Sequence, residues 1–418
     1  MEIYLVGGAV RDELLGLPVQ ENDWVVTGSS PEELLELGYQ QVGNSFPVFL
    51  HPETKEEYAL ARTERKTAAG YGGFDFDFNP EVTLEQDLQR RDLTINAIAK
   101  NANGKLIDPY GGLADLKNRL LRHVSEAFSE DPLRVIRVAR FHARLHHLGF
   151  SIHPKTFALM KTLSAGDELL ALSAERIWVE LQKGFAAPAP DIFLQTLYQC
   201  GALAKILPEL DQRFLHRDNL RDTADEVGKR TLAALRYLAN NHPLNFDNNT
   251  GKFTQRQQAS WAICCHALED NAAPKNLIPK VVAKINPQGS SIYQLCERLS
   301  APAEHRRLAI LAAHYMPLII QASNCNPQTI VDLLDACDAW RKPDQFGTLL
   351  LVAECLTSTA AQPQNNLNSI ALLRLAQKNC AGLSAQAFVD KGLSGEAIGE
   401  AMRNARKVAV AELKAQFG

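Results

Sequence analysis

The spacing of apolar positions divides the chain into two parts of different character. In residues 1–122, short runs rich in β-branched and aromatic side chains alternate with turn or polar residues, which is typical of strands in one small sheet. Helical segments lie between them. One helix is predicted over residues 8–15, where Gly16 stops it. A second helix begins at the capping box Ser30-Pro31-Glu32-Glu33 and ends at Gly38. The predicted strands are residues 3–6, 24–26, 48–50 and 58–60.

From about residue 114 the pattern changes to long amphipathic helices. A proline-containing break at residues 186–190 and polar segments at residues 239–257 and 361–369 indicate joints within this helical part. We therefore predict an α+β protein, in which a head with a small mixed sheet precedes an all-α remainder.

Composition and charge limit the kinds of partner. The 418 residues correspond to roughly two to four domains at ~150 residues each. The net charge of −4 excludes a polycation that coats nucleic acid by bulk charge, so a nucleic-acid site must be local. The charge is also uneven, because residues 1–122 carry a net charge of −8.

Two further features indicate a cytoplasmic protein. No apolar run approaches the ~20 residues of a membrane span, and the chain begins MEIYLVGG without the basic and apolar regions of a signal peptide. The eight cysteines all lie in the second half and form no C-x-x-C pair, so we expect reduced core residues rather than a zinc site or a disulfide framework.

A glycine pair marks the first candidate for binding chemistry. Gly7 and Gly8 lie between a predicted strand and a predicted helix, where backbone N–H groups can approach a phosphate closely. Arg11, one turn into that helix, is placed to add a bidentate phosphate contact. The simpler interpretation is a tight turn. The pattern is neither G-x-G-x-x-G nor a Walker loop, which disfavours dinucleotide and P-loop folds.

Two carboxylates precede the second predicted strand. Glu21 and Asp23 are two residues apart, so in an extended chain they point to the same side. Hard oxygen ligands in this arrangement suit Mg²⁺ together with substrate phosphates. A solvated strand edge is the alternative for an isolated pair, but the nearby glycine turn favours a metal and nucleotide site. Glu57 on a later strand is a candidate third carboxylate, with Glu56 equally available.

Arginines supply the third kind of chemistry. The run Arg90-Arg91-Asp92 precedes an apolar stretch. Beside a metal site, two adjacent arginines suggest triphosphate binding, and Asp92 is then available for a ribose contact. A helix predicted to begin at Glu130 carries a stripe of four arginines backed by an apolar face. Because residues 134–148 contain no acidic partner, we expect the stripe to meet anions; salt bridges are the structural alternative. The stripe comprises Arg134, Arg137, Arg140 and Arg144.

These motifs together resemble one family. GGAVRD, the E-x-D pair, RRDLTINA, DPYGG and EDPLRVIRVARF occur in the order and spacing of the class II tRNA nucleotidyltransferases, the bacterial CCA-adding enzymes, which are close relatives of bacterial poly(A) polymerases. The resemblance is close over residues 1–185, returns at residues 330–343, and fades between about 210 and 320.

The resemblance implies a nucleotidyltransferase head of the polymerase β type over residues 1–122. A helical neck with a nucleotide-selecting motif follows over 123–185, and a helical body and tail for tRNA binding over 186–418. It also implies that Glu21 and Asp23 hold the catalytic Mg²⁺. The positions implied to bind nucleotide are Gly8, Arg11, Arg91, Asp92, Glu130, Asp131, Arg134, Arg137 and Arg140.

By the same resemblance, the edges of CTP and then ATP are read by Asp131 and Arg134 rather than by a nucleic-acid strand. Asp offers acceptors and Arg offers donors, which complement the amine and ring nitrogen that cytosine and adenine share. The segment 66–78, rich in glycine and aromatic residues, corresponds to a mobile loop of the family, and we expect it to help switch the pocket from C to A.

Two departures from the family pattern matter. The first metal ligand is usually Asp, and Glu21 is one methylene longer. Many relatives also carry an HD phosphohydrolase domain, but this chain has no His-Asp doublet, so we predict that it does not hydrolyse a nucleoside 2′,3′-cyclic phosphate.

The expected function is addition of C, C and A to the 3′ end of tRNA from CTP and ATP, with release of pyrophosphate, in tRNA processing and repair. A poly(A) polymerase is the close alternative, disfavoured by the acidic pI of 6.3 and by the lack of basic terminal extensions. A CC-adding or A-adding specialist remains open, and an inert RNA-binding module is the remote alternative. The sequence does not indicate an oligomeric state.

Overall fold

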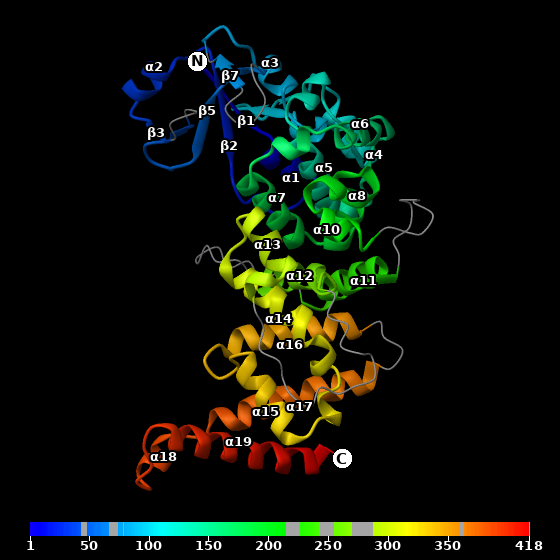
Figure 1. Cartoon of the computed structure of the whole chain (residues 1–418). Coiled ribbons are helices and arrows are strands. Elements are labelled where there is room, and N and C mark those ends of the chain that lie inside the picture. The colour runs from blue at the N-terminus through cyan, green and yellow to red at the C-terminus, as the bar shows by residue number, and fades with distance from the viewer. Residues whose placement is uncertain are drawn as a thin grey trace. The chain divides into compact units, whose positions relative to one another are not determined.

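The computed structural model describes residues 1–42, 48–66, 74–77, 79–214, 226–242, 255–269, 287–358 and 363–417. The chain divides into two compact units. One comprises Met1–Gly184 with Thr196–Ile206, and the other comprises Phe185–Gln195 with Leu207–Gly418. The first unit holds every described strand, and the second consists of helices and connecting segments in its described part (Figure 1).

A seven-stranded mixed sheet forms the centre of the first unit, in the order β3-β4-β5-β2-β1-β8-β9. Its neighbours pair antiparallel except β2 and β5, which are parallel. The four strands predicted from sequence are confirmed as β1, β2, β4 and β5. The strands are β1 (Glu2–Val6), β2 (Asp23–Thr27), β3 (Gln40–Val42), β4 (Val48–Leu50), β5 (Glu57–Leu60), β8 (Ala99–Asn101) and β9 (Leu106–Ile107).

Alternation along the strands gives the sheet two apolar faces. Val25 belongs to a cluster with Leu84 and Leu88, which cover one face, whereas Val26 packs with Leu34 on the other face. Ser30 forms the predicted capping box with Glu33 at the start of the helix that carries Leu34. The helices of this unit are α1 (Gly8–Leu14), α2 (Pro31–Glu36), α3 (Leu84–Gln89), α4 (Gly112–Asn118), α5 (Leu133–Leu145), α6 (Pro154–Ala165), α7 (Ala174–Ala186) and α9 (Ala202–Ile206).

One predicted helix begins later than expected. Residues Glu126–Glu130 form a 3-10 turn, and α5 begins at Leu133 rather than at Glu130. The cause is Pro132, because a proline disfavours helical geometry in the residue before it, and Asp131 is extended. Glu130 and Asp131 therefore precede the arginine-bearing helix. Two small strand pairs also went unpredicted: β6 (Thr63–Lys66) with β7 (Phe74–Asp77), and β10 (Leu120–Leu121) with β11 (Ser151–Ile152).

The second unit is built from packed helices. Helix α12 packs against α14 and α16, α16 packs against α17, and α19 packs against α15 and α17. Trp261 on α12 is fully buried and lies against Phe185. The helices are α10 (Pro208–Asp211), α11 (Glu226–Asn241), α12 (Gln255–Cys265), α13 (Ser291–Arg298), α14 (Ala303–Ile319), α15 (Pro327–Ala336), α16 (Pro343–Thr357), α17 (Pro363–Ala381), α18 (Gln386–Val389) and α19 (Glu396–Phe417), while α8 (Pro190–Cys200) is shared between the two units.

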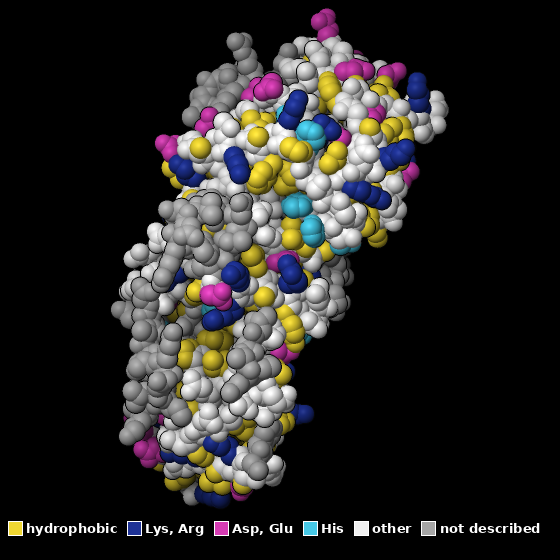
Figure 2. All heavy atoms as spheres, turned by 90° about the vertical axis from the view of Figure 1, so that its right-hand side faces the viewer, with side chains coloured by type: hydrophobic (Ala, Val, Ile, Leu, Met, Phe, Trp, Pro, Cys, Tyr) yellow, Lys and Arg dark blue, Asp and Glu magenta, His cyan; other side chains and the backbone are white. Residues whose placement is uncertain are grey.

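The α+β class is confirmed, and the surface agrees with the weak net charge. On the face shown in Figure 2, described Lys and Arg side chains are scattered among apolar and uncharged groups rather than gathered in one dense patch. Among the described helices, none has the length and hydropathy needed to cross a bilayer.

The segment 66–78, expected to act in nucleotide switching, lies largely outside the described residues.

The cysteines generate a prediction. All eight are unpaired and buried, and burial raises the pKa of Cys337 and Cys355 to about 12. Because the thiolate is the reactive form, a thiol reagent should label none of them rapidly at pH 8 in the native protein and all eight after unfolding. Rapid labelling of a native thiol would contradict the buried assignment.

Candidate active site

A pocket of about 200 Å³ opens beside the edge where β2 and β5 begin. Asp23 is the register partner of Glu57, so the two carboxylates stand at the same level on adjacent strands. Asp23 shares a sheet face with Val25, and Glu57 shares it with Ala61, because alternate residues point the same way. Val25 and Ala61 belong to the cluster that α3 covers. Both carboxylates therefore face the end of α3.

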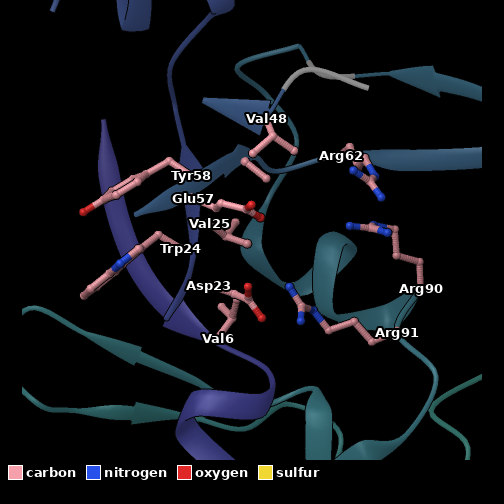
Figure 3. A pocket seen from close by; sticks show the side chains of 11 residues that line it. Val6, Asp23, Trp24, Val25, Val48, Glu57, Tyr58, Arg62, Arg90 and Arg91 are labelled. Carbon is pink, nitrogen blue, oxygen red and sulfur yellow. The ribbon is translucent and has the colours of Figure 1, made fainter. Parts of the chain in front are cut away.

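The structure distinguishes between Glu56 and Glu57. Glu57 lines the pocket, as Figure 3 shows. The Glu56 carboxylate instead accepts hydrogen bonds from Asn22 Nδ2 at 2.7 Å and Trp24 Nε1 at 3.1 Å. Glu57, rather than Glu56, is thus the carboxylate that lines the pocket together with Asp23.

Arginines form the opposite wall. Arg62, Arg90 and Arg91 line the pocket, and Figure 3 shows their guanidinium groups on the side facing Asp23 and Glu57. Arg90 and Arg91 follow α3 directly, so the helix that covers this sheet face also delivers the cations. A pocket with carboxylates on one wall and arginines on the other is suited to a metal-bound phosphate.

Gly7 allows this close approach. Its φ is 70°, and a Cβ there would lie 2.9 Å from Arg91 Nη1 and 3.9 Å from Asp23 Oδ2. A larger residue would therefore displace the arginine as well as strain the backbone. At Gly8, the first residue of α1, a Cβ would meet Arg11 Nη2 at 3.5 Å, which is ordinary contact. Of the two glycines, Gly7 is the one the site geometry requires.

The electrostatics of Asp23 reflect its surroundings. The residue is solvent-exposed, yet partial burial of its carboxylate raises its pKa, with Glu21 adding to the rise and Arg91 and Arg11 opposing it. Glu21 is therefore close enough to interact with Asp23, although it does not line the pocket. A bound cation would relieve the repulsion between these carboxylates.

The other predicted residues lie outside the pocket, several of them in a buried network. Arg11 is 2% exposed and donates to Asp12 and to Asn96 Oδ1. Asp92 is 6% exposed; it accepts from the Leu93 backbone N–H and Asn96 through Oδ1 and from Arg137 through Oδ2. Both oxygens of Asp92, expected to meet a ribose, are thus engaged inside the protein.

The arginine stripe corrects one expectation. Its members were expected to meet anions because no acidic residue lies nearby in sequence, but carboxylates from other elements pair with three of the four. Arg137 pairs with Asp92, Arg140 with Glu180, and Arg144 with Asp12. The Phe141 ring lies against the guanidinium groups of Arg11, Arg137 and Arg140.

The two residues expected to read the base are also engaged. Arg134 donates to the carbonyl of Ala127 at 2.7 Å and to that of Arg90 at 2.5 Å. Asp131 accepts from Arg176 Nη2 at 2.8 Å and from the Leu133 backbone N–H. The Arg134 bond to the Arg90 carbonyl connects this motif to the arginine wall. Glu130 is half-buried at the end of the preceding 3-10 turn.

Sequence reasoning missed three participants. Arg62 lines the pocket, Asp87 supports its arginine wall, and Glu180 pairs with the stripe. Asp87 had a signal, since it stands three and four residues before Arg90 and Arg91 on one helical segment. Glu180 had none, because its partners lie about 40 residues away along the chain.

Two family models match segments of this chain, and solved structures share its fold. Residues 3–122 match the poly A polymerase head domain, and residues 149–214 match the probable RNA and SrmB-binding site of polymerase A. The Thermotoga maritima CCA-adding enzyme complexed with tRNA is 19% identical, with a TM-score of 0.64 over 100% of this chain and 90% of that chain. The Bacillus stearothermophilus CCA-adding enzyme in complex with CTP is 22% identical, with a TM-score of 0.61 over 99% and 92%.

A further CCA-adding enzyme, in an apo form, is 20% identical, with a TM-score of 0.67 over 98% of this chain and 88% of that chain. The fold and the head domain define a nucleotidyltransferase. The head and the RNA-binding segment therefore match models drawn from poly A polymerases, and the chain has the fold of the CCA-adding enzymes. Nucleotidyltransferases of this fold generally use divalent metal ions.

The Asp92–Arg137 pair generates a stability prediction. Burial alone would raise the pKa of Asp92, but Arg137 and Asn96 outweigh it and hold the pKa well below the usual range. The pair therefore stabilises the fold above the unfolded-state pKa of ~3.9 and loses this effect as pH falls toward the folded-state pKa. Asp92→Asn should lower the free energy of unfolding by about 3 kcal/mol at pH 7.

Urea unfolding at pH 7 and at pH 3 tests this prediction. The difference between wild type and Asp92→Asn should be smaller at pH 3, because the wild-type carboxylate then loses part of its advantage. An equal difference at both pH values would contradict the ionic origin of the effect.

Proposed function

We propose that this protein adds C, C and A to the 3′ end of tRNA, using CTP and ATP and Mg²⁺. The observation that carries the proposal is the pocket in which Asp23 and Glu57 face Arg91 across the edge of a nucleotidyltransferase head. Fold likeness to CCA-adding enzymes solved with ATP, with CTP and with tRNA supports these substrates. We also propose that the enzyme acts in the cytoplasm.

The carboxylates fit a hard cation. Asp23 and Glu57 present oxygens at one level of the sheet, and Glu21 adds negative charge beside Asp23. We assign Mg²⁺ to Asp23 and Glu21, with Glu57 as the neighbouring carboxylate on the pocket wall. Among the described residues there is no group of three or more acidic, His or Cys side chains placed to hold a metal ion, so an ion here would need waters and substrate phosphates as further ligands. Such an ion would activate the attacking hydroxyl and neutralise phosphate charge.

The chain's own residues would bind and orient the substrates. Arg91 would contact the triphosphate beside Asp23, and Gly7 and Gly8 would let it approach the backbone. Arg11, Arg137 and Arg140, packed around Phe141, would add positive potential behind the site. Asp92 would hold Arg137 in place, and a ribose hydroxyl would have to donate to a carboxylate whose oxygens already accept from Leu93, Asn96 and Arg137. Fixed cations of this kind stabilise charge that develops on the phosphates during transfer.

Base selection would fall to Asp131 and Arg134, preceded by Glu130. Their bonds to Arg176 and to the Ala127 and Arg90 carbonyls orient both side chains. The exocyclic amine of C or A would donate to Asp131, and its ring nitrogen would accept from Arg134. U and G present an acceptor where Asp131 offers another acceptor, so they would leave buried groups unpaired.

An incorporation assay tests the function. With tRNA lacking its 3′ terminus, CTP and ATP should give addition of three nucleotides and then arrest, and omission of Mg²⁺ should abolish it. Unlimited addition from ATP alone would instead identify a poly(A) polymerase. Addition limited to C, or to A on a tRNA that already ends in CC, would identify a specialist. Absence of any incorporation would contradict the proposal.

The metal assignment generates a mutational prediction. Asp23→Asn should lower kcat by about 10²- to 10⁴-fold, since a catalytic metal contributes several kcal/mol to the transition state. Glu21→Ala should also reduce kcat, whereas Glu21→Asp should retain Mg²⁺-dependent activity.

Glu56→Gln is the matched control, because Glu56 lies next to Glu57 but bonds to Asn22 and Trp24. Its activity should stay near that of wild type. Unchanged activity in Glu21→Ala would exclude Glu21 as a ligand, and unchanged activity in Asp23→Asn would overturn the metal site.

A further inference from the structure

The arginine wall of the pocket has a buried support beneath it. Asp87 lies on α3, is completely inaccessible to solvent, and does not line the pocket. It therefore cannot touch a substrate. Its contacts, however, are with the chain segments that carry all three arginines of the wall.

The two carboxylate oxygens of Asp87 accept hydrogen bonds from different guanidinium groups of the wall. Oδ1 accepts from Arg90 Nη2 at 2.8 Å and from Arg90 Nε at 3.3 Å. Oδ2 accepts from Arg91 Nη2 at 3.2 Å and from Arg91 Nε at 3.3 Å. The backbone N–H of Arg62 donates to Oδ1 at 3.4 Å. One carboxylate thus fixes two guanidinium groups and the strand-end backbone of a third arginine.

The charge on Asp87 is maintained by this arrangement. Burial alone would raise its pKa, but Arg90 and Arg91, with Arg62, outweigh burial and keep the pKa below its usual value. Arg91 in turn lies near Asp23 across Gly7, and its charge opposes the rise in the Asp23 pKa. The buried carboxylate therefore holds the arginine that is electrostatically coupled to the metal-side carboxylate.

We propose that Asp87 is a positioning residue, which holds Arg90 and Arg91 in the orientation that binds the pyrophosphate portion of the nucleotide. The inference rests on the proposed function, because it assigns phosphate chemistry to the same pocket. A long arginine side chain loses conformational entropy when it binds a phosphate, and a carboxylate that fixes the guanidinium beforehand reduces that loss. Asp87 accepts from the Nε and Nη2 atoms of both guanidinium groups. Figure 3 shows the two groups directed toward the pocket.

Asp87→Asn tests the inference, because an amide keeps one acceptor and loses the charge. The probe is inorganic pyrophosphate with Mg²⁺, measured by calorimetry on the full chain. Affinity should fall about 10- to 100-fold, as expected when a charge-assisted contact is lost. In the incorporation assay, KM for CTP should rise more than kcat falls, whereas a purely structural defect would reduce the active fraction and leave KM unchanged.

Asp115→Asn is the matched control. Asp115 is also buried in the first unit and also pairs with an arginine, but this partner, Arg122, lies outside the pocket lining, unlike Arg90 and Arg91. Its variant should lose stability while binding pyrophosphate as wild type does. Equal loss of affinity in both variants, or unchanged affinity in Asp87→Asn, would overturn the inference.

Arg90→Gln covers the case in which Asp87→Asn does not fold. It should weaken pyrophosphate binding by itself. Where Asp87→Asn does fold, the double variant should weaken binding by less than the sum of the two free-energy changes, because both act through one contact. Unchanged affinity in Arg90→Gln would overturn the inference. Because pyrophosphate binding requires no tRNA, a wild type that binds it without adding nucleotides would disprove the proposed function and leave this inference standing.

Discussion

The site depends on one constraint, the parallel pairing of β2 with β5. That register sets Asp23 beside Glu57, and strand alternation turns both toward the face covered by α3. A shift of one residue in either strand would turn its carboxylate to the opposite face of the sheet. Because Arg90 and Arg91 follow α3, the same packing that buries Leu84 and Leu88 brings the cations opposite the carboxylates. Core packing and site geometry are therefore one arrangement.

A second layer of charge lies behind the pocket. Buried and half-buried arginines are costly to desolvate, and here carboxylates compensate. Asp87 pairs with the pocket wall, while Asp92, Glu180 and Asp12 pair with the arginines of α5. Compared with apolar side chains of the same volume such pairs add little net stability, although removing one partner is costly, and each pair fixes the orientation of its guanidinium. The acidic balance of the head thus has two sources, carboxylates that face the pocket and carboxylates that hold arginines.

The sequence predicted much of this and missed its long-range part. Local signals were sufficient for β1, β2, β4, β5 and the Ser30 capping box, because apolar runs and caps act over a few residues. They were not sufficient for the partners of the arginine stripe, since Asp92 and Glu180 approach Arg137 and Arg140 through tertiary packing. The choice of Glu57 over Glu56 likewise required the strand register. The pattern of apolar residues predicted that α5 begins at Glu130, but Pro132 moves the observed start to Leu133.

The most direct test of this account is the position of the metal. Mn²⁺ scatters anomalously and can replace Mg²⁺, so a crystal of the protein grown with Mn²⁺ and CTP would locate the ion without reference to activity. We predict an anomalous peak within bonding distance of Asp23, on the pocket side of the β2 and β5 edge, with the triphosphate between it and Arg91. A peak at another site, or a nucleotide bound away from this pocket, would contradict it.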